Sequence, residues 1–357
     1  MAEVNMEELL NCALCPNICR CECPVLQVSG REAVAPSGKA RLAAMLQHKQ
    51  LNWDEPVFEA ISNCLSCRGC TIYCPFTELS LCDELLNTRL AAKASGIRLP
   101  VIDPCISNLK NYGSPYGQKG GPSAAGKKGA EVLYFAGCTS QANHPSSIDA
   151  ARKLLNKAGV SFQMIDEDCC GYPAEVWGDQ ELARQLAAEN RRKIVDSGAS
   201  ILVTNCPECW LTFTDRYPVW EQDLPLEVID GPTYFLRLLR EGQLKPKKSE
   251  FEKISYHDPC IWARAAKKTD EPREILSLIP GINVQEPLSY GEQTRCCGGG
   301  SMFQLSFPET AEAIAERRLA EFPEDAVIVT ACPFCREGLL QEGRRVLELV
   351  EILEQSC

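Results

Sequence analysis

Short apolar runs alternate with amphipathic stretches along the last two thirds of the chain. The apolar runs VLYFAG, ILVTN and VIVTA are rich in β-branched and aromatic residues, as buried parallel strands are. The stretches SSIDAARKLLNKAG, ELARQLAAENRRKIVDSG and ETAEAIAERRLAEF place apolar residues at helical spacing. Because strands alternate with helices, the pattern predicts parallel α/β sheets in this region.

The same order of motifs occurs twice in this region. Three pairs of segments match: ILVTNCPEC at 201–209 with VIVTACPFC at 327–335, DEDCCGYP at 166–173 with QTRCCGGG at 293–300, and VLYFAGC at 132–138 with KISYHDPC at 253–260. A repeated order of matching segments indicates an internal duplication. We therefore expect two α/β domains, over residues 130–245 and 246–357.

The first third of the chain has a helical pattern instead. Ser37 is a suitable cap for a helix over residues 38–50, and residues 78–97 also place apolar residues near helical spacing. We expect a largely helical domain over residues 1–110. Residues 111–129 are rich in Gly, Pro and Ser and predict a linker, which is either a flexible tether or an ordered strap against a metal site.

The chain is rich in cysteine, with 22 cysteines among its 357 residues, and the cellular compartment decides whether these form disulfides or bind metal. The N-terminus lacks a basic region followed by a long apolar core, so no signal peptide is expected. No apolar run reaches the roughly 18 residues of a membrane helix. We expect a cytoplasmic protein, where thiols stay reduced and clustered cysteines indicate metal rather than disulfides. The net charge of −11 argues against binding to nucleic acid.

The cysteine run CLSCRGCTIYCP has the spacing of bacterial ferredoxins. Cys64, Cys67, Cys70 and Cys74 are separated by two, two and three residues, and Pro75 follows. Three closely spaced thiolates cover one face of a cubane cluster, and the fourth ligates a neighbouring cluster. Zinc sites use two separated Cys-x2-Cys pairs instead, so the run predicts iron and sulfur.

A second run, CALCPNICRCECP, departs from this spacing. Cys19 comes one residue late but stands three residues before Cys23 and Pro24, so we assign Cys19 as a ligand and leave Cys21 spare. With the crossover of two-cluster ferredoxins, the two [4Fe-4S] clusters take Cys12, Cys15, Cys19 and Cys74, and Cys64, Cys67, Cys70 and Cys23. Cys82 is expected to be a small core residue, and Cys105 and Cys357 fit no motif.

Each of the two duplicated domains carries five more cysteines. One cysteine, a Cys-Cys-Gly and a Cys-Pro-x-Cys follow predicted strands, and ligand sites of open α/β sheets lie at the carboxyl ends of strands. The strand ends would therefore bring one, two and two thiolates to one place. Five thiolates exceed the four that one zinc takes, although a zinc site with a spare cysteine remains the alternative.

These motifs resemble the cysteine-rich CCG domains of heterodisulfide reductase. A twin-cluster ferredoxin domain ahead of two CCG domains resembles its D-type subunit, and it is also similar to the iron–sulfur subunits of glycolate oxidase and anaerobic glycerol-3-phosphate dehydrogenase. The resemblance implies one or two non-cubane [4Fe-4S] clusters. Their ligands would be Cys138, Cys169, Cys170, Cys206 and Cys209 in the first copy, and Cys260, Cys296, Cys297, Cys332 and Cys335 in the second.

Two functions follow from the resemblance. In the first, the CCG pair reduces the disulfide of a small thiol compound, and His257 or His144 protonates the thiolates that leave. In the second, the chain only transfers electrons for a flavin-dependent dehydrogenase of a 2-hydroxy acid or of glycerol 3-phosphate. No dinucleotide fingerprint is present, so flavin or nicotinamide is expected on a partner subunit. A membrane cytochrome subunit is a further candidate partner, and it would attach the protein to a membrane.

Overall fold

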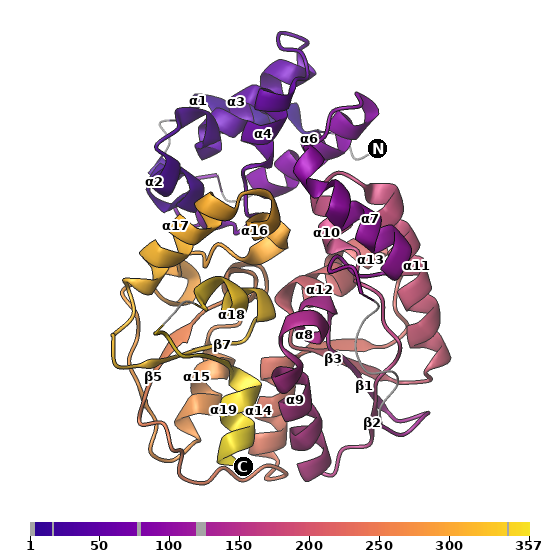
Figure 1. The fold of residues 1–357 in the computed structure, drawn as a ribbon, viewed down its shortest axis with the longest axis vertical. Helices are drawn as coiled ribbons and strands as arrows, with labels where there is room; N and C mark the ends of the chain where they lie inside the picture. The colour runs from indigo at the N-terminus through magenta and orange to yellow at the C-terminus, as the bar shows by residue number, and fades with distance from the viewer. Residues whose placement is uncertain (1–3, 16–17, 77–79, 119–125, 341–342) are drawn as a thin grey trace.

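The computed structural model describes residues 4–15, 18–76, 80–118, 126–340 and 343–357, and it shows a helical N-terminal part packed on two α/β domains (Figure 1). This arrangement confirms the predicted fold class. The N-terminal helices are α1 (Met6–Leu14), η1 (Ile18–Glu22), α2 (Pro24–Ser29), η2 (Glu32–Val34), α3 (Pro36–Gln47), α4 (Glu55–Ser62), α5 (Gly69–Ile72), α6 (Leu81–Ala94), η3 (Pro100–Ile102) and α7 (Asp103–Tyr112).

The two long helices predicted here both exist, but their starts differ from the prediction. Helix α3 begins at Pro36 after the cap residue Ala35, and proline is well suited to a first helical position because its missing N–H is not needed there. Ser37 is therefore buried in the first turn and is not the cap. Helix α6 lies within the predicted 78–97, of which residues 78 and 79 fall outside the described part of the chain.

The first α/β domain has a four-stranded parallel sheet in the order β2-β1-β3-β4. Its strands are β1 (Val132–Phe135), β2 (Phe162–Gln163), β3 (Ile201–Thr204) and β4 (Glu227–Asp230). Its helices are α8 (Cys138–Asn143), α9 (Pro145–Lys157), α10 (Tyr172–Val176), α11 (Gln180–Asp196), α12 (Pro207–Leu211), the π-helix η4 (Thr212–Arg216), α13 (Tyr217–Val219) and α14 (Gly231–Arg240).

The second α/β domain repeats this sheet in the order β6-β5-β7-β8, again parallel. Its strands are β5 (Lys253–His257), β6 (Asn283–Val284), β7 (Val327–Thr330) and β8 (Val346–Glu348). Its helices are the π-helix η5 (Ile261–Ala265), α15 (Asp270–Ser277), η6 (Gly291–Gln293), η7 (Gly300–Met302), α16 (Phe303–Ser306), α17 (Pro308–Leu319), α18 (Pro333–Leu339) and α19 (Leu349–Ser356).

The edge strand β4 and its counterpart β8 were not predicted, because neither has a long apolar run. Strand β4 reads EVID and exposes Glu227, and β8 has only three residues. Edge strands need only one hydrogen-bonded neighbour, and short or charged edges also discourage pairing with other chains. The strand that was expected before each Cys-Cys-Gly is present as β2 and β6, but each of these has only two residues.

The two α/β domains pack through equivalent helices. Helix α9 contacts α19, and its counterpart α15 contacts α14, which is the counterpart of α19. In the same way α12 contacts η5, while α18 contacts α8. For each contact between a helix of the first domain and a helix of the second, the equivalent helices with the domains interchanged are also in contact. A pseudo-twofold relation between duplicated domains requires this.

The N-terminal part lies across both α/β domains (Figure 1). Helix α2 contacts α17 of the second domain, and α6 contacts α10 of the first. The buried guanidinium of Arg89 on α6 donates to the carbonyl oxygens of Cys64 and Val176, at 3.2 and 3.3 Å. One buried cation therefore bonds to both the N-terminal part and the first α/β domain. No helix in the described ranges is long and apolar enough to span a bilayer.

The predicted linker begins as an ordered strap on the first domain. The carbonyl oxygen of Gly113 accepts a hydrogen bond from the backbone N–H of Cys169 at 2.6 Å. The hydroxyl of Tyr116 lies 3.1 Å from Oγ1 of Thr139, the residue after Cys138. The strap therefore contacts Cys169 and the residue after Cys138, both in the first α/β domain. Residues 119–125 lie outside the described structure.

Candidate metal centres

The N-terminal cysteines gather in two groups. One group, called here the outer set, consists of Cys12, Cys15, Cys19 and Cys74, which line one cavity with Tyr73 and Phe76. Burial and the neighbouring thiols of Cys19 and Cys74 raise the pKa of Cys12 to about 12. Cys74 thus lies with the first run, although it belongs to the second in sequence.

The other group, called the inner set, consists of Cys23, Cys64, Cys67 and Cys70, which line a second cavity. Cys23 has come from the first run, which is the arrangement that the crossover prediction needs. Cys82 of α6 also lines this cavity, and its thiol bonds to those of Cys64 and Cys70. Cys21 is exposed and donates to the carbonyl oxygen of Ile18, so it joins neither group.

The five cysteines of the first α/β domain also converge. This first CCG set consists of Cys138, Cys169, Cys170, Cys206 and Cys209, all buried. Cys138 begins α8 directly after β1, and Cys206 caps α12 directly after β3. The sulfur atoms of Cys138 and Cys169 are 3.8 Å apart. The thiols of Cys169 and Cys209 hydrogen-bond to Cys170 and hold its pKa well below the ordinary value.

The second CCG set has the same plan and consists of Cys260, Cys296, Cys297, Cys332 and Cys335. The thiols of Cys296 and Cys335 lower the pKa of Cys297, as their counterparts do for Cys170. The backbone N–H of Gly299 donates to the sulfur of Cys297 at 3.4 Å. The N–H of Cys335 donates to the sulfur of Cys332 at the same distance. N–H groups aimed at sulfur stabilise an anionic thiolate or cluster.

The glycine after each cysteine pair has a structural cause. Gly171 and Gly298 have φ values of +101° and +83°, a region that other residues rarely adopt. A Cβ on Gly298 would lie 2.6 Å from the carbonyl oxygen of Ala311 on α17, and one on Gly171 would lie 2.9 Å from that of Ala183 on α11. The Cys-Cys-Gly motif therefore lets the following helix approach the thiols closely.

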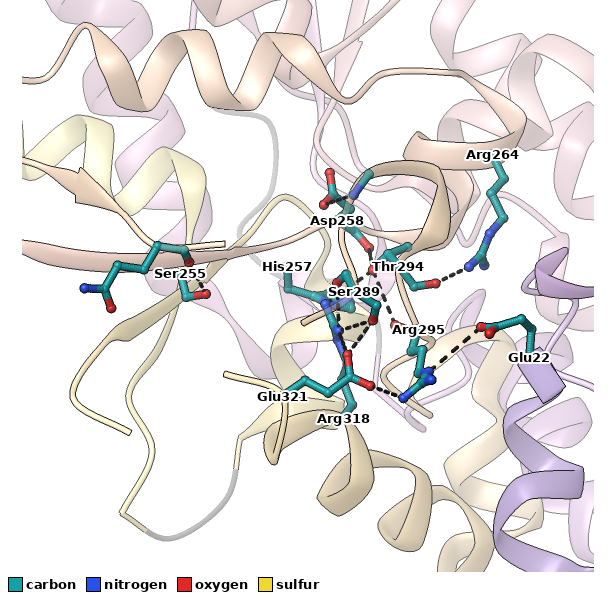
Figure 2. A network of polar contacts seen from close by, with 12 residues as sticks. Glu22, Ser255, His257, Asp258, Arg264, Ser289, Thr294, Arg295, Arg318 and Glu321 are labelled. Carbon is teal, nitrogen blue, oxygen red and sulfur yellow. Dashed lines mark hydrogen bonds and ion pairs between the residues drawn. The ribbon is translucent and has the colours of Figure 1, made fainter. Parts of the chain in front are cut away.

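The inner set touches the second CCG set directly. The thiols of Cys67 and Cys296 are hydrogen-bonded, and the Cys296 thiol lowers the pKa of Cys67 to about 7. Arg264 of η5 donates to the carbonyl oxygen of Cys67 at 2.6 Å and also to that of Thr294 (Figure 2). One guanidinium therefore joins the backbone of the two cysteine groups.

One continuous buried core contains the whole first CCG set and three cysteines of the second, Cys297, Cys332 and Cys335. Glu208, inside the Cys-Pro-Glu-Cys turn of the first domain, accepts a hydrogen bond from the backbone N–H of Ser301 in the second domain at 2.6 Å. Burial raises the pKa of Glu208 to about 8. Cys206 and Cys332, which end equivalent strands, are close enough for the charge of one to raise the pKa of the other.

The two histidines proposed as proton donors have different surroundings. His257 is buried, and one of its ring nitrogens lies within 4.8 Å of the sulfur atoms of Cys297 and Cys335. The neighbours that shift the pKa of His144 are Arg336, Glu351 and Pro333, none of them a cysteine. Burial lowers the pKa of both histidines, that of His144 to about 4, so distance to the thiols and not pKa separates the two. The geometry therefore favours His257 and gives no support to His144.

The donor sets fit iron–sulfur clusters. Each CCG set consists of five cysteines, all of them buried except Cys260, which is partly buried, and the N–H groups that point at sulfur in the second set would hydrogen-bond to a cluster there. One tetrahedral zinc would leave one thiol of each set without a role. The eight thiols of the outer and inner sets line two cavities, with Cys70 lining both, and eight is the number of ligands that two cubane clusters require.

Several residues around the sets gave no signal in the sequence. Arg264, Arg318 and Glu208 are charged residues of ordinary helices and turns, and only the packing of distant segments brings them to the cysteines. For Cys82 the sequence predicts only a small core residue, because it stands on a predicted helix outside the ferredoxin spacing. It is buried, but it faces the thiols of the inner set.

Comparison with protein families gives two matches. The CCG cysteine-rich domain family matches residues 132–214 and 254–339. The 4Fe-4S dicluster domain family matches residues 8–77. The matched ranges contain both CCG sets and both ferredoxin runs, so the chain binds iron–sulfur clusters.

Individual relatives span most of the chain. The sequence is 28% identical to the D-type subunit of the dihydromethanophenazine:CoB–CoM heterodisulfide reductase of Methanosarcina mazei, over 99% of this chain and 93% of the relative. It is 26% identical to the EtfAB:quinone oxidoreductase of Syntrophomonas wolfei, over 85% of this chain and 48% of the relative. A crystal structure of a hypothetical protein from Helicobacter pylori has the same fold, with a TM-score of 0.60 and 11% identity over 93% of this chain and 71% of that one.

Proposed function

We propose that this chain, which belongs to the iron–sulfur proteins that join a 4Fe-4S dicluster domain to two CCG cysteine-rich domains, is the electron-relaying subunit of a heterodisulfide reductase-like complex. Electrons would enter at the outer set and pass through the inner set to the second and then the first CCG set. A flavoprotein or another redox subunit would supply them. The CCG pair would deliver them to a disulfide.

The observation that carries this order is the contact between Cys67 and Cys296. It places the inner set against the second CCG set, and Arg264 bonds to the backbone of both. The outer set is linked to the inner set through the short segment from Cys70 to Cys74. Clusters held by these residues would lie in a row, with no large gap for an electron to cross.

Disulfide reduction suits a pair of one-electron carriers that lie close together. When bound, the two CCG clusters would each supply one electron, and RSSR + 2e⁻ + 2H⁺ gives two RSH. The chain's own residues would hold the two sulfur atoms of the substrate between the sets and keep water out. Glu208 and Ser301 join the two domains there, so that the sets stay at a fixed separation.

Spectroscopy of the anaerobically purified protein tests this function. Adding an oxidised small-molecule disulfide, such as a mixed disulfide of two low-molecular-weight thiols, should change the electron paramagnetic resonance signal of a CCG cluster. Cys297→Ala should abolish the change, and Cys21→Ala should leave it intact because Cys21 is exposed and joins no set.

A second function is supported by one of the relatives. The similarity to the EtfAB:quinone oxidoreductase favours a relay that serves an electron-transfer flavoprotein and has no disulfide substrate. If no disulfide perturbs any cluster while a flavin dehydrogenase or an electron-transfer flavoprotein reduces the protein quickly, this second function replaces the first.

A further inference from the structure

The two CCG domains repeat their thiols but differ in the polar residues around them. The last residue of the central strand is Phe135 in the first domain and His257 in the second. The two positions are equivalent, because Phe135 pairs with Thr204 and His257 pairs with Thr330 in the same register. Both side chains are buried, but only the histidine offers a hydrogen bond to a neighbour.

A buried arginine fixes the orientation of that histidine. The Nε of Arg318 on α17 donates to Nδ1 of His257 at 3.2 Å, and the Arg318 side chain is fully buried (Figure 2). Because Nδ1 accepts this bond, the proton of the neutral ring is on Nε2. Nε2 is buried and bonds to no nitrogen or oxygen atom of the described residues, and the thiol of Cys297 is the polar group beside the ring. The sulfur atoms of Cys297 and Cys335 lie close to the ring, so a cluster held by these two thiols would lie beside His257.

Charged groups of both signs lie near His257, and Arg318 is the cation that bonds to its ring. Glu321 is the carboxylate that pairs with Arg318, but it is shared with Arg295, at 2.6 Å from that guanidinium. Arg295 also faces Glu22 at 3.9 Å (Figure 2). Asp258, the buried residue after His257, pairs with Arg273. The remaining contacts of Arg318 are neutral acceptors, the carbonyl and hydroxyl oxygens of Ser289 and the hydroxyl of Thr294.

The equivalent strand position of the first set has no such donor, although the hydroxyl of Thr212 lies 3.7 Å from the sulfur of Cys170. Phe135 contributes an apolar ring that packs edge-on against Phe213, with the ring centres 4.9 Å apart. A nearby cation and N–H groups directed at sulfur stabilise the reduced, more negative form of an iron–sulfur cluster and raise its reduction potential. An apolar ring does neither.

We propose that His257 and Arg318 hold the reduction potential of the cluster in the second CCG set above that of the cluster in the first. An electron that leaves the inner set would then rest first on the second set, the set that Cys67 touches. The proposal rests on the proposed function only in assuming that each CCG set binds a cluster. His257 acts on the cluster directly, and Arg318 is a positioning residue because it orients His257.

An anaerobic redox titration followed by electron paramagnetic resonance tests the proposal. The signals of the two CCG clusters are assigned with Cys170→Ala and Cys297→Ala. In the wild-type protein, the signal that depends on Cys297 should appear at the higher potential. His257→Phe, which installs the residue of the first domain, should shift that midpoint to a lower potential and leave the Cys170-dependent midpoint unchanged.

Matched variants separate electrostatic tuning from damage to the fold. His257→Gln keeps an N–H donor and should restore most of the wild-type midpoint. His144→Phe removes the other buried histidine, and Arg317→Gln removes the neighbouring arginine on α17, which bonds to Gln27 at the surface. Neither should shift the midpoint. Arg318→Gln should lower it, and this variant decides the question if His257→Phe does not retain its cluster.

Iron content measured on the same samples distinguishes the ways in which the proposal fails. A wild-type protein without iron in the second CCG set would overturn the proposed function. A protein with both CCG clusters in which the Cys170-dependent signal appears at the higher potential would overturn this inference alone. So would a midpoint that stays at the wild-type value in both His257→Phe and Arg318→Gln.

Discussion

At the scale of single residues, most of the candidate ligands could be predicted from spacing. The runs around Cys12 and Cys64 and the two CCG motifs gave eighteen cysteines, and the structure brings these into four groups. The residues that surround them could not be predicted. Arg264 and Cys67 are far apart in sequence, so their bond depends on how the N-terminal part packs on the second domain. His257 was chosen for its position near Cys260, but only the structure shows its bond to Arg318.

The crossover of ligands between the two runs is a residue-scale prediction. Cys23→Ser and Cys64→Ser should perturb the same electron paramagnetic resonance signal, because both thiols line the inner cavity. Cys74→Ser and Cys12→Ser should perturb the other signal. Cys21→Ser is the matched control and should be silent, since its thiol faces a backbone carbonyl at the surface. If Cys23→Ser instead groups with Cys12→Ser, each run supplies all four ligands of its own cluster and the crossover is wrong.

At the scale of elements, the sequence predicted the central strands and the long helices well. Apolar runs such as ILVT and VIVT form strands because both faces of each central strand are buried. The edge strands β4 and β8 escaped prediction because β4 carries an exposed Glu227 and β8 has only three residues. The start of α3 was misplaced because Pro36 at the first turn competes with Ser37 as a helix start, and proline defines the beginning.

The glycine of the Cys-Cys-Gly motif gives a prediction at this scale. Gly298→Ala should destabilise the second domain by strain from its φ of +83° and by the 2.6 Å clash with the carbonyl oxygen of Ala311. Gly159→Ala has a similar strain, at a φ of +73°, but its new Cβ would meet no described atom within 4 Å. The control should cost about 1–2 kcal/mol. Thermal unfolding under anaerobic conditions should show the larger loss for Gly298→Ala, together with loss of iron. Equal losses in the two variants would show that the contact with Ala311 does not matter.

At the scale of the whole molecule, the duplication predicted two similar domains, and the helix contacts between them follow the expected exchange. What the sequence could not predict is the position of the N-terminal part. Nothing in the ferredoxin runs indicates that Cys67 should meet Cys296 rather than a thiol of the first CCG set. The contact between Cys67 and Cys296 makes the two CCG sets unequal. In the proposed relay, the second CCG set lies next to the inner set, and electrons reach the first CCG set through the second.

Metal analysis of the anaerobically purified protein tests the central claim most directly, since a relay through all three domains needs a cluster in each of the four sets. The account predicts about sixteen iron atoms and a similar amount of acid-labile sulfide per chain, with zinc far below one. A content of about eight iron atoms, with zinc bound in place of the rest, would contradict it, because the CCG sets would then be zinc sites and the relay would stop at the inner set.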